Sequence, residues 1–285
     1  MKHANLHLHS TFSDAQFTPE QLFLIGKSLG YKAMALTDHE TDGGVDRLMK
    51  YAALQGGVDV ISGIEFYGKH EGVSLHLTAL DYDMNDTGLR AFVKERCDLR
   101  EECTRKCVER GIEIGVIRDI TWNDVLDNTE AGSWMCIDSV MNTYRAKRIP
   151  IPSNLRADCF KGPEVRAFTP KYPTAEEVIK VVRKAGGIIA LAHPYKQTHF
   201  VPALVEFGLN GIEVSHPDNY ENTSALAVEA AKTYNLYHCG GTDHTGPMSG
   251  CDGKYAIPVF NGITEEEQFK NNNHEVLLIN CTFYS

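Results

Sequence analysis

The chain has 285 residues, 42% of them hydrophobic and 23% charged, with a formal net charge of −10. This balance is typical of a globular protein with a packed core. The negative charge argues against partners such as nucleic-acid duplexes or anionic membrane surfaces. No apolar run approaches the ~20 residues of a membrane-spanning helix, and the opening segment MKHANLHLHS lacks the apolar core of a secretory signal. We therefore expect a cytoplasmic protein, whose oligomeric state the sequence leaves open.

The eight cysteines predict no disulfide framework. None of them forms a Cys-x-x-Cys pair, and their scatter is typical of reduced thiols in a cytosolic protein. Cys103 and Cys107 lie four residues apart on an expected helix and could share a metal ion. Partners with the spacing of a zinc finger are missing, which argues against such a site.

Short strands alternate with helices along most of the chain. Residues 4–9 alternate strictly, so that Asn5, His7 and His9 share one face of a strand. Thr18 suits the cap of the helix that follows. Strands are expected at residues 4–9, 32–39, 58–66, 73–80, 186–193, 210–216 and 235–244. Helices are expected at 18–30, 43–56 and 224–234, near 88–110, and after a capping box that runs from Thr174 to Glu177.

Seven strands, mostly separated by helices, predict an α/β fold with a parallel sheet or a barrel. The gap between the third and fourth strands is too short for a crossover helix, so we expect an irregular barrel. Residues 81–171 contain no further strand–helix repeat. The sequence therefore predicts a barrel formed by residues 1–80 and 172–285, with residues 81–171 as an inserted small domain.

Histidines and carboxylates gather at the C-terminal ends of the expected strands. In barrels, this is where the active site is built. A single histidine on a strand is more often structural, but the repeated pattern argues for one shared site. Imidazoles and carboxylates without thiolates suit Mn²⁺, Zn²⁺ or Fe. The residues concerned are His7, His9, Asp38, His39, Glu65, His76, His193, Glu213, His216, Asp243 and His244.

Six segments resemble the motifs of the PHP (polymerase and histidinol phosphatase) family of metal-dependent phosphoesterases. They stand in the family's order and cover the chain except for residues 81–171. The segments are HLHSTFSD (7–14), ALTDH (35–39), SGIE (62–65), HLTAL (76–80), LAHP (191–194) and GGTDH (240–244). The resemblance implies a distorted (β/α)7 barrel that binds two to three divalent metal ions, most often Mn²⁺, with Zn²⁺ or Fe²⁺ as alternatives.

The resemblance also implies a set of metal ligands. One ion would be held by His7, His9, Glu65 and Asp243, a second by Asp14, His39 and a histidine of the last motif, and a third by Glu65, His76 and His193. The last motif departs from the family pattern, which is Asp, any residue, His. Here His244 follows Asp243 directly. We take His244 as a ligand, and the alternative is that Thr245 or water fills this place.

Within the family, the chain resembles the cyclic phosphate dihydrolase type. This likeness implies a small phosphorylated substrate, a phosphoribosyl 1,2-cyclic phosphate, which is opened and then loses the resulting phosphate. Histidinol phosphatase and 3′,5′-nucleotide bisphosphate phosphatase are the alternative activities. A PHP domain that binds metal without catalysis is a third alternative, although this chain retains nearly the full ligand set.

Three residues are expected to act in catalysis. Glu65 and Asp14 would hold the ions that activate water for attack at phosphorus. His216 follows a strand end in EVSHPDN, so it is a candidate proton donor for the leaving group, with a surface loop residue as the alternative. Asp38 and Glu213 are expected to orient ligand histidines.

The expected insertion is basic between residues 140 and 171. Seven basic residues face only two acidic ones there, a local balance of +5 in a chain of net charge −10. A solvated loop would explain such a run equally well. Because the segment leaves the barrel after the fourth strand, it could also close over the site as a lid. Arginine suits paired hydrogen bonds to phosphate, so Arg145 and Arg148 are expected to bind a second phosphate of the substrate.

Overall fold

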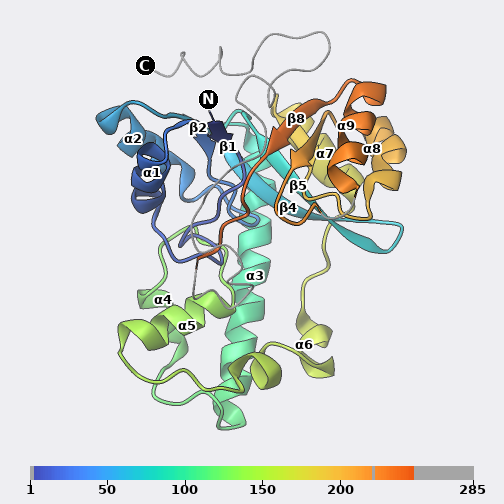
Figure 1. Ribbon diagram of the computed structural model, residues 1–285. Coiled ribbons are helices and arrows are strands. Elements are labelled where there is room, and N and C mark those ends of the chain that lie inside the picture. Colours follow the sequence, from blue (N-terminus) through green and yellow to red (C-terminus); the bar gives the residue numbers. More distant parts are fainter. Residues whose placement is uncertain (1–2, 220–221, 247–285) are drawn as a thin grey trace.

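The computed structural model describes residues 3–219 and 222–246 of the chain, and these form a mixed α/β fold with two sheets (Figure 1). The three-stranded sheet has the order β1-β2-β3 and the five-stranded sheet the order β4-β5-β6-β7-β8. The strands are β1 His3–Asn5, β2 Tyr31–Ala35, β3 Asp59–Ile61, β4 Gly63–His70, β5 Val73–Leu80, β6 Ile188–Leu191, β7 Gly211–Ser215 and β8 Tyr237–Gly240.

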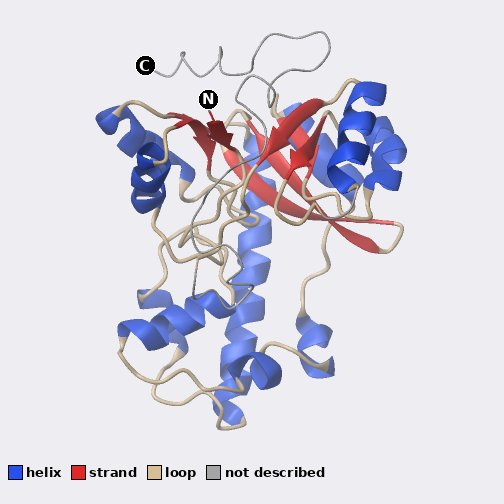
Figure 2. Cartoon of the chain, in the orientation of Figure 1, coloured by secondary structure: helices blue, strands red, loops and turns tan. Residues whose placement is uncertain are grey.

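Helices surround both sheets, as Figure 2 shows. They are α1 Pro19–Ser28, α2 Val45–Gln55, α3 Thr87–Glu113, α4 Trp122–Asp127, α5 Ile137–Ala146, α6 Pro163–Phe168, α7 Ala175–Lys184, α8 Val201–Phe207 and α9 Thr223–Tyr234. A π-helical turn at Leu155–Cys159 and a 3₁₀ turn at Thr198–Phe200 complete them. The capping box of Thr174 and Glu177 is confirmed. Within the described ranges, every helix is too short or too polar to cross a membrane.

Only some of the strands in the two sheets pair in parallel. Strands β1 to β3 pair in parallel, as do β6 to β8, whereas β4 and β5 form an antiparallel hairpin and β5 pairs antiparallel with β6. Glu71 and Gly72 join the hairpin, and both have positive φ angles, 47° and 80°. A tight two-residue hairpin turn of type I′ requires a positive φ angle at both of its residues. The irregularity expected after the third strand is therefore confirmed.

The expected strand 58–66 is wrong as a single element. It breaks at Ser62 into β3 and β4, which belong to different sheets. A Cβ at Gly63 would lie 2.5 Å from the Leu36 carbonyl oxygen, so β4 can cross the end of β2 only at a glycine. The isolated bridges Leu8↔His244 and His39↔Glu65 connect the two sheets. The barrel is not closed by continuous ladders, so a regular (β/α)7 barrel is not confirmed.

Three hydrophobic clusters stabilise this arrangement. Small side chains such as Ala33, Ala35 and Ala190 fill the space between the strands. The five-stranded sheet packs against α7, α8 and α9 around residues such as Ile189. The three-stranded sheet packs against α1 and α2 around residues such as Leu22. Burial of each large aliphatic side chain contributes about 1.5–3 kcal/mol, which holds the strand ends in fixed positions.

Among the described residues between 81 and 171, the regular elements are all helical. The helix α3 runs from the sheets to the lower part of the molecule, where α4, α5 and α6 lie (Figure 1). The helices α3, α4 and α5 share a hydrophobic cluster of their own around Val108 and Tyr144. The segment also contacts the barrel, because the Trp134 N–H donates to the Phe12 carbonyl at 2.8 Å. The boundaries of a separate domain and its role as a lid stay predictions.

The cysteines of the described ranges support the expected reduced state. All six cysteines in these ranges are free thiols. Cys251 and Cys281 lie outside the described residues. The same holds for the part of the expected barrel beyond residue 246. Cys103 and Cys107 pack beside Val165 in a small apolar cluster. Within the described part of the chain, no group of converging metal-ligating atoms includes a cysteine.

Candidate metal centre

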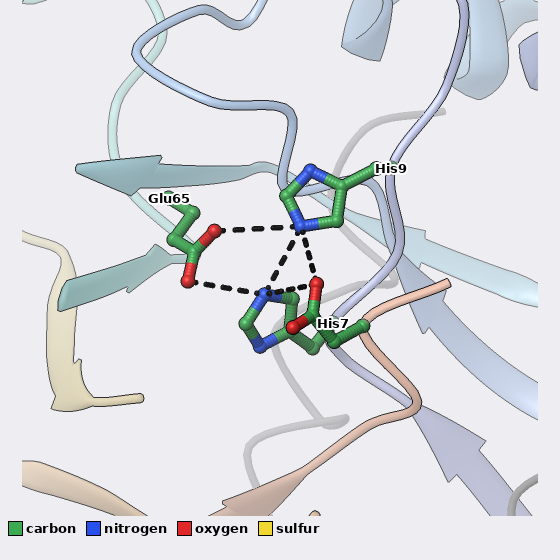
Figure 3. A group of neighbouring side chains, drawn as sticks. His7, His9 and Glu65 are labelled. Atoms are coloured by element: carbon green, nitrogen blue, oxygen red, sulfur yellow. Dashed lines mark hydrogen bonds and ion pairs between the residues drawn. The ribbon is translucent and has the colours of Figure 1, made fainter. Parts of the chain in front are cut away.

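Four side chains meet where β1, β4 and β8 approach one another: His7, His9, Glu65 and Asp243 (Figure 3). Their ligand atoms all lie within 4.8 Å of one another. The two Nε2 atoms of His7 and His9 are 3.2 Å apart, and Asp243 Oδ1 lies 3.0 Å from His9 Nε2. These are the four residues expected to hold the first ion.

The backbone around Asp243 is shaped to bring this carboxylate to the histidines. A Cβ at Gly241 would lie 2.3 Å from the Cβ of His7, so only glycine allows the chain after β8 to pass so close. The Asp243 N–H then donates to the His7 carbonyl at 3.0 Å. Asp243 itself has a φ of 49°, in the left-handed region that aspartate tolerates better than most residues.

Glu65 stands at the centre of the site. Its Oε1 lies 2.8 Å from His76 Nδ1 and 3.1 Å from His193 Nε2. Its Oε2 lies 3.0 Å from His39 Nδ1. The two carboxylate oxygens therefore face different histidines, as a carboxylate that bridges two ions must.

The remaining expected ligands surround this carboxylate. His9, Asp14 and His39 form one further group of converging ligand atoms, and His39, Glu65 and His76 form another. His193 lies beside the latter, with its Nε2 3.1 Å from His76 Nδ1. The structure thus brings together eight of the nine expected ligands: His7, His9, Asp14, His39, Glu65, His76, His193 and Asp243.

The electrostatics of the cluster fit bound cations. Burial disfavours the charged imidazole of His7, but Glu213, Glu65 and Asp243 outweigh this effect and raise its pKa well above the usual value. Burial likewise opposes ionisation of Glu65, yet the histidines hold its pKa well below the usual value. Glu65 Oε2 and His39 Nδ1 lie 3.0 Å apart and are buried, but neither makes a hydrogen bond to a described residue. A metal ion would satisfy both atoms.

Glu213 supports two of these ligands. Its Oε1 lies 2.9 Å from His7 Nδ1, and its Oε2 accepts the backbone N–H of His193 at 2.6 Å. The His193 backbone has a φ of 26°, a strained conformation that this hydrogen bond helps to maintain. Burial opposes ionisation of Glu213, but His7 lowers its pKa. The carboxylate therefore accepts a hydrogen bond from Nδ1–H, which leaves the Nε2 lone pair of His7 directed at the metal position.

Asp38 organises the loop that carries Asp14. Its Oδ1 accepts the Ser10 N–H at 2.7 Å and the Ser13 hydroxyl at 2.5 Å, and its Oδ2 accepts the Ser10 hydroxyl at 2.6 Å. Burial raises the pKa of Asp38, and the hydrogen bonds from Ser10 and Ser13 oppose this shift. The orienting role expected for Glu213 agrees with its contacts to His7 and His193, whereas the hydrogen bonds of Asp38 hold the loop and not a ligand histidine.

His216 is buried beside Asp243 and faces the site. Its Nδ1 accepts the Asp218 N–H at 3.0 Å, and its Nε2 lies 3.5 Å from Asp243 Oδ2. Because the Nδ1 lone pair is used, the neutral ring carries its proton on Nε2. His216 is therefore placed to donate an Nε2–H hydrogen bond toward the site. It also forms a group of converging ligand atoms with His7 and Glu213, and its burial contradicts a surface loop position.

The structure does not bring His244 to the ligand groups. Its ring stacks on Phe17, with centroids 5.3 Å apart and planes 14° apart, and it belongs to none of the four groups of converging ligand atoms. This position of the ring does not favour metal binding by His244, and its role as a ligand stays a prediction.

The expected phosphate ligands of the insertion lie at the end of α5. Arg145 is in the last turn of this helix, where its Nη1 donates to Asn142 Oδ1 at 2.6 Å. Arg148 is an exposed residue just beyond that helix, with a φ of 57°. Their role in phosphate binding stays a prediction.

Aromatic residues that sequence reasoning missed cover one side of the centre. The Tyr67 hydroxyl lies 3.3 Å from His39 Nε2, and the Trp134 ring centroid lies 5.2 Å from that of His39. Strand alternation could have placed Tyr67 on the same face as Glu65, two residues before it. Trp134 lies in a loop without periodicity, so no sequence signal indicated it.

The chain is similar to several characterised proteins. The profile of the PHP domain matches residues 5–146. The chain is 29% identical to the phosphoribosyl 1,2-cyclic phosphate 1,2-diphosphodiesterase of Eggerthella lenta, over 85% of this chain and 94% of that protein. It is 27% identical to a 5′-3′ exoribonuclease of Haemophilus influenzae, over 85% and 89% of the two chains. It is 25% identical to a 3′,5′-nucleoside bisphosphate phosphatase of Chromobacterium violaceum, over 88% and 90%.

A solved structure shows the same fold. It is that of a protein from Bifidobacterium adolescentis, assigned as a metal-dependent phosphoesterase, with a TM-score of 0.75 and 25% identity over 93% of this chain and 94% of that chain. Fold, ligand groups and relatives together define a metal-dependent phosphoesterase, a hydrolase of phosphoric esters. The chain belongs to the PHP family, as its sequence motifs indicate.

Proposed function

We propose that this phosphoesterase acts on a small phosphorylated sugar, a phosphoribosyl 1,2-cyclic phosphate, opening the cyclic diester and then hydrolysing the resulting monoester. The observation that carries the proposal is the position of Glu65, whose two oxygens face different histidines. Such a carboxylate suits neighbouring ions that act on phosphorus. The relative from Eggerthella lenta supports the choice of substrate.

The ligand groups support a centre of two to three divalent ions, with Mn²⁺ proposed ahead of Zn²⁺ and Fe²⁺ because the donors are imidazoles and carboxylates. One ion would be held by His7, His9, Glu65 and Asp243, a second by Asp14 and His39, and a third by Glu65, His76 and His193. Bound ions would supply positive charge to the phosphate oxygens and lower the pKa of the attacking water.

The protein's own residues fix where the reactants sit. Glu65 and Asp14 are assigned to catalysis because both buried carboxylates flank His39, at 3.0 Å and 3.6 Å. Both carboxylates orient His39, which lies beside the positions that water and phosphate must reach. His216 would donate an Nε2–H hydrogen bond to the leaving oxygen, and its Nδ1 stays fixed by the Asp218 N–H. A donor positioned where negative charge develops typically contributes about 10²–10³-fold to the rate.

Two alternative activities keep specific support. The relative from Chromobacterium violaceum favours a bisphosphate phosphatase, whereas histidinol phosphatase rests on the motif resemblance alone. The exoribonuclease relatives act on a polynucleotide by name, but the net charge of −10 favours a small substrate here. A domain that binds metal without catalysis is disfavoured by the eight converging ligands.

A substrate screen with Mn²⁺ distinguishes these activities. The screen compares a phosphoribosyl 1,2-cyclic phosphate, adenosine 3′,5′-bisphosphate, histidinol phosphate and p-nitrophenyl phosphate by kcat/KM. The proposal predicts the highest value for the cyclic phosphate. A higher value for the bisphosphate would shift the assignment to that activity, and no hydrolysis of any ester would contradict phosphoesterase activity altogether.

A further inference from the structure

A small pocket lies beside the metal centre and plays no part in holding the ions. Its cationic wall consists of Arg96 and Arg100, which are four residues apart and therefore on one face of α3. In Figure 1, α3 passes from the sheets to the lower helices, so the pocket lies where these two parts of the molecule meet. It is lined by Glu40, Arg96, Arg100, Trp134, Pro170 and Tyr172.

Aromatic rings connect this pocket to the metal ligands. Trp134, which lines the pocket, has its ring centroid 5.2 Å from that of His39. Tyr67 stacks on His39 at 4.8 Å and on Tyr172 at 4.7 Å. The pocket is thus about one aromatic ring away from an expected metal ligand.

Arg96 is available to a ligand. Its Nη1 donates to the Lys171 carbonyl at 3.1 Å, which fixes the side chain without neutralising it. Its Nε is buried and has no hydrogen-bond partner among the described residues. A buried donor without an acceptor costs about 1–3 kcal/mol. Its ion pair with Glu95, at 3.6 Å, involves a largely exposed carboxylate and adds little.

Arg100 is held in place in a similar way. Its Nε donates to the Met135 carbonyl at 3.1 Å, and its guanidinium lies 4.5 Å from the centroid of Trp134. Within the described ranges, no carboxylate forms an ion pair with it. Glu40 is the acidic group in the pocket lining, and its Oε1 accepts the Tyr67 N–H at 2.7 Å. Two guanidinium groups thus outnumber one carboxylate, in a protein that is otherwise strongly acidic.

We propose that Arg96 and Arg100 bind the second phosphate of the substrate, the one that is not hydrolysed. This inference rests on the proposed function and specifies the substrate class as doubly phosphorylated. Planar guanidinium groups suit phosphate oxygens through paired hydrogen bonds. A phosphate in the pocket would satisfy the buried Arg96 Nε. Binding of this remote group would position the reacting phosphate over the ions.

The first test compares two cyclic substrates on the Mn²⁺-loaded protein: ribose 1,2-cyclic phosphate with and without the 5-phosphate. The readout is the ratio of their kcat/KM values. Loss of a charge-assisted hydrogen bond predicts that this ratio falls about tenfold or more in Arg96→Gln and in Arg100→Gln. Arg105→Gln is the matched control, because Arg105 lies on the same helix but pairs with Glu102 and Glu109 at the surface. Its ratio stays at the wild-type value.

A second measurement needs no turnover. The chain contains two tryptophans, Trp122 and Trp134, so Trp122→Phe leaves Trp134 as the fluorescent reporter of the pocket. Titration of the metal-loaded protein with inorganic phosphate gives an apparent Kd. This Kd rises about tenfold when Arg96→Gln is added, and it stays unchanged when Arg105→Gln is added.

The two measurements separate this inference from the proposed function. If the protein hydrolyses no ester but phosphate binding depends on Arg96, the pocket stands and the proposed activity falls. An unchanged ratio together with an unchanged Kd in Arg96→Gln and Arg100→Gln would overturn the inference, even in an active enzyme. The inference would also be overturned if the ratio of kcat/KM values fell only in a double variant, Arg145→Gln with Arg148→Gln. That result would assign the second phosphate to the basic segment between residues 140 and 171.

Discussion

His7 and Glu213 form a buried pair, with Nδ1 of the imidazole 2.9 Å from Oε1 of the carboxylate. The other carboxylate oxygen accepts the His193 N–H, so Glu213 must accept at both oxygens. Glutamine has one accepting oxygen only, and its amide would face one of these donors. Glu213→Gln is therefore expected to weaken metal binding about 10–100-fold. Competition with a chelator measures this affinity.

The control for Glu213 is Glu206→Gln, an exposed glutamate on α8. It should leave metal affinity unchanged. Wild-type affinity in Glu213→Gln would show that this carboxylate does not orient His7.

His216 is predicted to matter most for poor leaving groups. If its Nε2–H donates a hydrogen bond to the leaving oxygen, His216→Asn slows hydrolysis of phenyl phosphate more than that of p-nitrophenyl phosphate, whose leaving group needs little stabilisation. We expect a loss of about 10²-fold or more for the former. The ratio of the two kcat values measures the effect. Equal losses would assign His216 a structural role beside Asp243.

The strand pattern made much of the metal site predictable. Residues 4–9 place His7 and His9 on one face, and this alternation is visible in the local sequence. Glu65 was predicted at a strand end, but it lies near the start of β4. Its place in the site therefore followed from the motif resemblance and not from periodicity.

Other features depend on contacts between distant segments. The break at Ser62 follows from the approach of Gly63 to the Leu36 carbonyl, which no local pattern signals. His244 lies one residue before the histidine position of the family motif, and only its stacking on Phe17 shows where its ring points. Arg96 lies on the long helix α3, where charged residues are frequent, and tertiary contacts alone distinguish it from exposed arginines.

His244 is predicted to contribute to packing and not to metal binding. Its side chain is fully buried against Phe17, so His244→Phe should retain the metal content. His244→Ala leaves a cavity and should lower the free energy of unfolding by about 2–4 kcal/mol. Elemental analysis and denaturant unfolding measure the two effects. If His244→Phe loses one equivalent of metal, His244 is a ligand, as the family resemblance implies.

Metal binding is predicted to release protons. Burial lowers the pKa of His7 and His9, but the neighbouring carboxylates raise both pKa values well above the usual range. In the metal-free protein these shifts favour the charged form of the pair, and a metal ion must displace the protons that the two Nε2 atoms carry. The affinity for metal ions is expected to rise with pH until the pH exceeds the raised pKa values of His7 and His9, and to fall as the pH is lowered.

Calorimetry of Mn²⁺ binding at pH 7 in buffers of different ionisation enthalpy counts the released protons. We expect between one and two protons per first ion, since two histidines share that site. A heat of binding that is the same in all buffers would contradict the charged state of this pair.

The central claim is that Glu65 organises a metal centre that hydrolyses a cyclic phosphate. The most direct measurement follows a phosphoribosyl 1,2-cyclic phosphate by ³¹P NMR with the Mn²⁺-loaded protein and with Glu65→Gln. The account predicts that the wild type converts the cyclic diester signal into a monoester and then into inorganic phosphate. Glu65→Gln should leave the diester intact while keeping a native circular dichroism spectrum. An unreactive wild type, or near-normal turnover by Glu65→Gln, would contradict the account.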